Sequence, residues 1–120
     1  MARTKHYRDL IVWQKAMELA RMVYRKTEGF PKAEVFGLGL QLRRAAVSVP
    51  SNIAEGHGRL TDPQLANSIG IARGSLYEVQ TQIQLAQDLG FVDAASAEEI
   101  LGLSVETAKL LNGLLGVLER

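Results

Sequence analysis

Residues 65–86 read LANSIGIARGSLYEVQTQIQLA, and this stretch decides the fold. Its apolar residues recur at alternating intervals of four and three residues. Residues 100–117 show the same alternation, beginning with an interval of three. Straight, nearly antiparallel helices with this period pack knobs into holes, which is the geometry of a four-helix bundle. The expected core positions are Leu65, Ile69, Ala72, Leu76, Val79, Ile83 and Ala86, then Ile100, Leu103, Thr107, Leu110, Leu114 and Val117.

Two further helices are expected in the first half of the chain. The first runs from Asp9, as N-cap, to Glu28, and the second runs from about Ala33 to Gly56. Both carry apolar residues at helical spacing. The expected apolar faces are Leu10, Trp13, Met17, Ala20, Val23 and Tyr24 for the first helix, and Leu38, Leu42, Ala45, Val49, Ile53 and Gly56 for the second. Trp13 is expected either in the core or at a subunit contact.

The last two helices have clear end signals. Asp62 is the expected N-cap of the third helix, with Pro63 in its first turn, and Gly90 ends it. Asp93 or Ser96 caps the fourth. Because the connections are short, neighbouring helices must run antiparallel. The sequence therefore predicts an all-α fold, an antiparallel up-down-up-down four-helix bundle.

Composition fits one small globular domain spanning residues 1–120, with residues 1–8 expected to form a flexible N-terminal tail. Hydrophobic residues make up 47% of the chain, and there is no cysteine. The N-terminus has no apolar run that would act as a signal peptide, and no stretch approaches eighteen uninterrupted apolar residues. We expect a cytoplasmic protein that does not span a membrane.

Charge is distributed unevenly although the net charge is only +1. Residues 1–32 hold eight Lys or Arg against three acids, whereas residues 91–120 hold two against five. Such polarity can steer the protein toward an acidic partner or pair opposite ends of two copies, and it also fits an ordinary solvated surface. A strongly basic nucleic-acid binder would have a higher pI than 8.1.

The segment 41–56 is the most unusual part of the chain, because Pro50 falls inside a predicted helix. The apolar spacing keeps its phase across the proline, which predicts one helix kinked at Pro50. A polar ridge runs beside the apolar face with steps of three and four. It is either a recognition surface or a solvated face with local bonds to the backbone freed by the proline. The ridge consists of Gln41, Arg44, Ser48, Asn52, Glu55 and Arg59.

Three stretches of the chain resemble one known family. They are DLIVWQKA at 9–16, QLRRAAVSVPSNIAEGHG at 41–58 and IARGSLYE at 71–78. The chain resembles the four-helix-bundle proteins encoded in intervening sequences of bacterial 23S ribosomal RNA genes, which are similar to accessory proteins of diversity-generating retroelements. This resemblance implies an up-down-up-down bundle that assembles as a homopentameric ring. It also implies a role in binding RNA or in partnering a reverse transcriptase.

Enzymatic motifs are absent from the sequence. The two histidines are His6 and His57, and there is no HExxH or GxSxG motif. We therefore expect no enzyme, no metal site and no cofactor. An alternative is a small-ligand site near Asn52, Glu55 and His57, while Gly56-His57-Gly58 is better explained as a helix terminus with a positive φ.

Glycines in the third predicted helix indicate a close approach of two helices. Gly70 and Gly74 each cost about 1 kcal/mol relative to alanine inside a helix, so a packing reason is expected; the alternative is that they are tolerated on a solvated face. Glu78, one turn beyond Gly74, is placed to meet Arg43 or Arg44 in an ion pair.

Taken together, the sequence predicts a non-enzymatic oligomeric interaction module that binds RNA or a nucleic-acid-processing partner. The alternatives are a structural homo-oligomeric scaffold without nucleic-acid binding and the small-ligand site. The arginines expected to present charge to phosphate are Arg43, Arg44, Arg59 and Arg73. The residues expected at a polar subunit contact are Gln41, Ser48, Asn52, Glu55 and Glu78.

Overall fold

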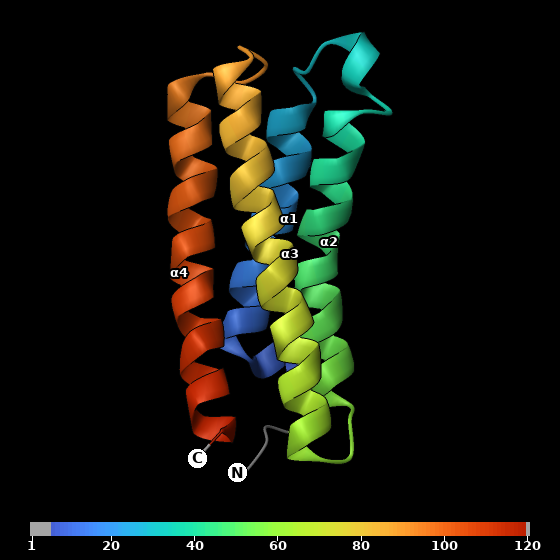
Figure 1. Ribbon diagram of the computed structural model, residues 1–120, viewed down its shortest axis with the longest axis vertical. Coiled ribbons are helices and arrows are strands. Elements are labelled where there is room, and N and C mark those ends of the chain that lie inside the picture. Colours follow the sequence, from blue (N-terminus) through green and yellow to red (C-terminus); the bar gives the residue numbers. More distant parts are fainter. Residues whose placement is uncertain (1–5, 120) are drawn as a thin grey trace.

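Four long helices lie side by side in the computed structural model, which describes residues 6–119 (Figure 1). No strand occurs within this described range, so the all-α prediction is confirmed. Two short 3-10 helices, Tyr7–Asp9 and Lys32–Glu34, precede the first and second long helices. The long helices are α1 (Ile11–Thr27), α2 (Leu38–His57), α3 (Asp62–Asp88) and α4 (Ala94–Leu118).

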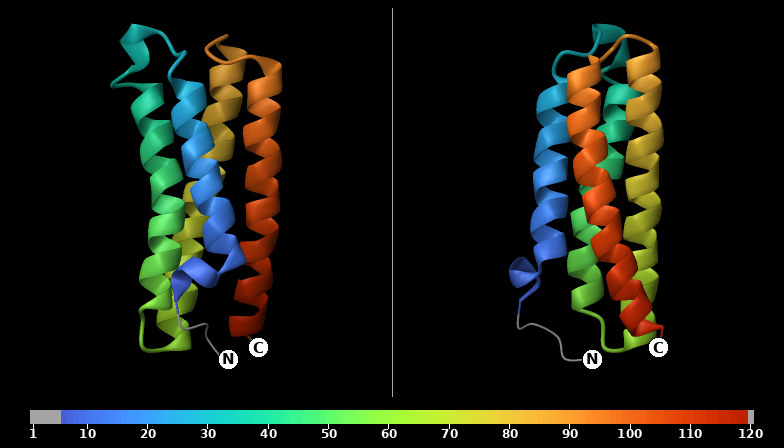
Figure 2. Two further views of the ribbon diagram at one scale, coloured as in Figure 1. Left: turned by 180° about the vertical axis from the view of Figure 1, so that it is seen from behind. Right: turned by 90° about the vertical axis from the view of Figure 1, so that its left-hand side faces the viewer.

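The helices form a square bundle in which each helix packs beside its neighbours in the chain, and α4 closes the square against α1. Each helix runs antiparallel to the next, so the predicted up-down-up-down topology is confirmed (Figure 1). Figure 2 shows α1 from its outer side, with α2 and α4 flanking it. The bundle is slender, with principal extents of 45 × 22 × 20 Å.

The predicted core positions of α2 and α3 are all buried. In α4 the prediction holds for Ile100 and Thr107 but fails further on, because Leu110 and Val117 are exposed. Leu111 takes the core position there, followed by Leu115. A straight α-helix has 3.6 residues per turn, so a strict 3.5-residue series drifts off the buried face within a few turns.

The predicted core face of α1 is also partly wrong. Leu19 and Ala16 are fully buried, whereas Trp13 and Met17 are only partly buried and Tyr24 is exposed. The helix therefore carries two apolar stripes. One stripe fills the core and the other borders α2 on the outside of the bundle.

Helix starts differ from the predictions for local reasons. Leu10 is extended and Asp9 sits in a 3-10 turn, so α1 begins at Ile11 without the Asp9 cap. Instead of beginning near Ala33, α2 begins at Leu38, whose amide donates to Glu34 Oε1 at 3.1 Å.

Side-chain caps start the last two helices. Thr61, and not Asp62, caps α3 by accepting the Gln64 amide at 3.3 Å. Asp93 caps α4 as predicted, and the hydrogen bond from the Ser96 amide lowers the pKa of its carboxyl group.

The second helix continues without a break through Pro50, as the apolar spacing predicted. The Asn52 amide donates to the Ser48 carbonyl at 2.8 Å, which is local bonding on the polar ridge. The size of the bend at Pro50 stays a prediction. The predicted positive φ after His57 is wrong, because Gly58 has φ −81°. Within the described residues Gly90, just beyond α3, is the glycine in the left-handed region, with φ +76°.

The prediction that two helices approach closely at Gly70 and Gly74 is wrong. A Cβ added at either position would have no neighbour within 4 Å. The close approach occurs at Gly56, where an added Cβ would lie 2.8 Å from Ser68 Cβ across the α2–α3 contact. The mid-helix glycines of α3 therefore face open space in the single chain.

Two expectations about the chain ends and membranes stay predictions. Residues 1–5 of the expected tail lie outside the described residues, while Tyr7 and Arg8 belong to the first 3-10 helix. By length and composition alone, α4 is long and apolar enough to cross a membrane, with 39% of its most apolar window buried. Core helices of soluble proteins meet the same criterion, and α4 contributes Ile100 and Leu111 to the core.

Candidate interaction site

An open groove of about 580 Å³ runs along the outside of the bundle between α1 and α2. Aromatic, apolar and arginine side chains dominate its walls, and none of the described residues that line it is acidic. The α1 wall carries Trp13, Met17, Ala20, Arg21, Tyr24 and Arg25, the α2 wall carries Val47, Pro50, Ser51 and Ala54, and Tyr7 lies at one end.

Polar and aromatic contacts close both ends of this groove. At one end Arg43 Nε donates to Thr27 Oγ1 at 2.8 Å, and its guanidinium lies 4.6 Å from the centre of the Tyr24 ring. At the other end the Tyr7 ring packs edge-on against Trp13, with ring centres 5.3 Å apart. The middle of the groove is left open between these two closures.

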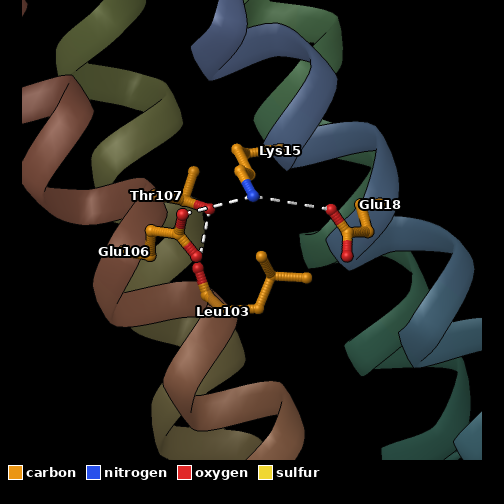
Figure 3. Close-up of polar contacts among 5 residues, drawn as sticks. All are labelled: Lys15, Glu18, Leu103, Glu106 and Thr107. Atoms are coloured by element: carbon orange, nitrogen blue, oxygen red, sulfur yellow. Dashed lines mark hydrogen bonds and ion pairs between the residues drawn. The ribbon is translucent and has the colours of Figure 1, made fainter.

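Charge on α1 is divided between its two outer flanks. On the α4 side, Lys15 Nζ lies 3.2 Å from Glu106 and 3.9 Å from Glu18 (Figure 3). On the groove side, Arg21 and Arg25 form no ion pair or hydrogen bond with any described residue. The positive charge at the groove is therefore not neutralised within the described part of the chain.

A second groove, of about 290 Å³, lies between α2 and α3 and is polar. Ser48 and Ser75 share a hydrogen bond of 2.8 Å across it, and Gln82 Oε1 is buried without a partner among the described residues. Arg44 and Glu78 both line this groove, yet neither the Arg44–Glu78 nor the Arg43–Glu78 ion pair forms. The predicted intramolecular ion pair of Glu78 is therefore wrong.

The four predicted phosphate-binding arginines do not gather on one patch. Arg43 is used inside the bundle, where it closes the α1–α2 groove. Arg59 pairs with Glu55 one turn earlier, and Arg73 donates to Asn112 Oδ1 on α4 at 3.0 Å. Arg44 alone of the four faces the polar α2–α3 groove without an ion pair among the described residues.

The alternative small-ligand site is not assembled either. Asn52 bonds to Ser48 on the α3 side of α2, while the His57 ring lies 6.5 Å from the Tyr7 ring on the α1 side. Glu55 is exposed and pairs with Arg59. Within residues 6–119, no group of three or more His, Cys, Asp or Glu side chains is placed to hold a metal ion.

Sequence reasoning missed the second apolar stripe of α1 as a surface feature. The apolar spacing places Met17 and Tyr24 on the core face and Trp13 in the core or at a subunit contact, although Arg21 and Arg25 stand beside them at helical spacing. The signal was present, because Ala16, Leu19 and Val23 already provide a complete core stripe on another side of the helix.

These observations define a four-helix-bundle protein whose distinctive surfaces are lateral grooves between helices. The chain belongs to the 23S rRNA-intervening sequence protein family, whose sequence profile matches residues 8–113. A crystal structure from Bacteroides thetaiotaomicron, of a protein of unknown function from the S23 ribosomal protein family, superposes with a TM-score of 0.79. It is 24% identical and the match covers 88% of this chain and 98% of that one, which shows a shared fold. No curated protein matches the chain.

Proposed function

We propose that this chain is a non-enzymatic interaction module that assembles with copies of itself into a ring, for which the family resemblance implies five subunits. The observation that carries the proposal is the α1–α2 groove, which is built like half of a protein interface. Tryptophan, tyrosine, methionine and arginine are enriched at interface cores, and lysine, glutamate and aspartate are depleted. Six of the lining residues are of the enriched types, and none of the described ones is Lys, Glu or Asp; the small residues Ala20, Ser51 and Ala54, of types that interface cores use less, lie between them.

Exposed apolar residues elsewhere support self-association. Large hydrophobic side chains are exposed on every long helix, and clustered exposed apolar surface marks interaction sites. Assembly of several copies of the chain would cover part of this exposed apolar surface. A cytoplasmic location, expected from the lack of cysteine, remains part of this proposal.

Sedimentation velocity on the wild-type protein and two matched variants tests the proposal. Val47→Glu places a charge in the groove wall, and Val105→Glu places the same charge on a similarly exposed valine of α4. We expect an oligomeric wild type, a Val47→Glu variant shifted to smaller species and an unaffected Val105→Glu variant. A wild type that remains monomeric at about 100 μM would overturn the proposal.

RNA binding is a second candidate function, favoured by the charge of Arg44, which forms no ion pair among the described residues. In a ring this arginine would be repeated on each subunit. Binding of single-stranded RNA should weaken steeply as salt rises, and Arg44→Ala should reduce that salt dependence, whereas Lys109→Ala on α4 should not. No binding at about 50 mM salt would remove this candidate.

A further inference from the structure

The outer side of α3 carries a second series of residues, which has the same spacing along the helix as the core residues of α3. From residue 67 to residue 85 it alternates steps of four and three, and every member is exposed. Ile71 and Leu85 are 49% and 47% exposed, and Glu78 stands midway between them. We call this series the α3 ridge; it consists of Asn67, Ile71, Gly74, Glu78, Thr81 and Leu85.

The walls of the α1–α2 groove have the same spacing as the α3 ridge. On α1 the positions Trp13, Met17, Ala20 and Tyr24 alternate steps of four, three and four. On α2, Pro50 and Ala54 continue from Val47 with steps of three and four. Ridges spaced at 3.5 residues interdigitate when helices lie nearly parallel or antiparallel. A third helix with this spacing therefore fits between α1 and α2.

The groove and the apolar part of the α3 ridge also have similar lengths. Trp13 and Tyr24 are eleven residues apart, which is about 16 Å along a helix, and Ile71 and Leu85 are fourteen apart, about 21 Å. The apolar ends of the α3 ridge thus reach from one end of the groove to the other. The ridge needs no change of backbone conformation to do so.

The α1–α2 groove and the α3 ridge are also complementary in charge and in side-chain size. The groove has Arg21 and Arg25 at its rim, and the α3 ridge has one acid, Glu78, without an ion pair among the described residues. Gly74 leaves the ridge backbone bare, because an added Cβ there would meet nothing within 4 Å. A neighbouring helix can therefore approach closely at this point, which would account for a glycine that costs helix stability.

From these matches we infer that the α3 ridge of one copy docks in the α1–α2 groove of the next copy, with Glu78 against the arginines of the groove rim. The groove and the ridge lie on different sides of the bundle, so the contact is heterologous and repeats from copy to copy. Such a contact gives a ring when the rotation closes. This inference rests on the proposed self-assembly and names its two surfaces.

Cross-linking of two single-cysteine variants tests the contact directly, because the wild-type chain has no cysteine. Ser51→Cys lies between Val47 and Ala54 on the α2 wall, near the middle of the groove, and Gly74→Cys lies near the middle of the α3 ridge, so the pair depends little on the direction in which the ridge lies. A mixture of S51C and G74C should form disulfide-linked dimers under mild oxidation. Neither variant alone should do so, nor should S51C mixed with V105C.

A charge exchange provides the second test. Glu78→Arg should weaken association at least tenfold by placing like charges together, and combining it with Arg21→Glu and Arg25→Glu should restore most of the loss. Both variants change exposed side chains, so circular dichroism should show unaltered helix content. If the wild type is oligomeric but the cysteine mixture fails to cross-link and Glu78→Arg has no effect, this inference fails while self-assembly stands. A monomeric wild type would remove both.

Discussion

The two grooves that flank α2 are closed in different ways, although they share one helix. Toward α3, Gly56 lets the backbone approach so closely that a Cβ would lie 2.8 Å from Ser68, and Ser48 bonds to Ser75. Toward α1, the contacts of Arg43 and Tyr7 close only the two ends, and about 580 Å³ stays open between them.

This difference separates the parts of the sequence that stabilise the bundle from those that leave a surface free. Small and hydroxyl side chains bring α2 and α3 together, and Ser48 there forms hydrogen bonds with Ser75 and Asn52. Toward α1, large side chains such as Trp13 and Met17 line the outer groove and are only partly buried. The α1–α2 side thus has apolar surface that only a further molecule would cover.

Replacing Gly56 by valine should have the largest effect on folding. The added atoms cannot be accommodated beside Ser68 and Leu65 without moving α2 away from α3, so the free energy of unfolding should fall by about 1–3 kcal/mol. Urea denaturation measures this directly. Gly70→Val is the matched control, because an added Cβ there meets nothing within 4 Å and valine is a better helix former than glycine. Equal losses in the two variants would show that the close approach at Gly56 is not what joins these helices.

Removing Arg43 should have an intermediate effect that is confined to the α1–α2 side. Arg43→Ala loses hydrogen bonds to Thr27 and to the Tyr24 carbonyl, as well as the contact with the Tyr24 ring, which should cost about 1–2 kcal/mol. Arg43→Lys should recover little, because an ammonium group cannot donate from the Nε position. Arg44→Ala is the neighbouring control and should stay within about 0.5 kcal/mol. A loss in the control as large as in Arg43→Ala would contradict the assignment.

The sequence predicted the helices and their order because apolar period and turn signals act locally. The α3 core was correct throughout, since its 3.5-residue series stays buried from Leu65 to Ala86. In α4 the same series leaves the buried face after Thr107, because the buried positions Thr107, Leu111 and Leu115 are four residues apart, closer to the 3.6-residue period of a straight helix than to the heptad.

The candidate site was harder to predict because it depends on which of two apolar stripes turns inward. Trp13 and Leu19 are both apolar and both at helical spacing, and only packing against α2 and α4 decides that Leu19 enters the core. The hydrogen-bond partner of the Arg43 side chain could not be predicted from the sequence for a related reason. Its partner Thr27 lies sixteen residues away, across a turn whose geometry no local pattern specifies.

The smallest effect on folding is expected at Val47, and it separates the two grooves most sharply. Val47 is 41% exposed in the open groove, while Val49, two residues on, is fully buried. Val49→Ala should destabilise the fold by about 1–3 kcal/mol, whereas Val47→Ala should change the free energy of unfolding by less than about 0.5 kcal/mol. Both values are obtained by urea denaturation at concentrations low enough to keep the chains dissociated. If Val47→Ala nonetheless weakens association in sedimentation velocity, the groove wall contributes to assembly and hardly at all to folding. If it destabilises the dissociated chain as much as Val49→Ala does, the groove is part of the core and the contrast between the two sides of α2 disappears.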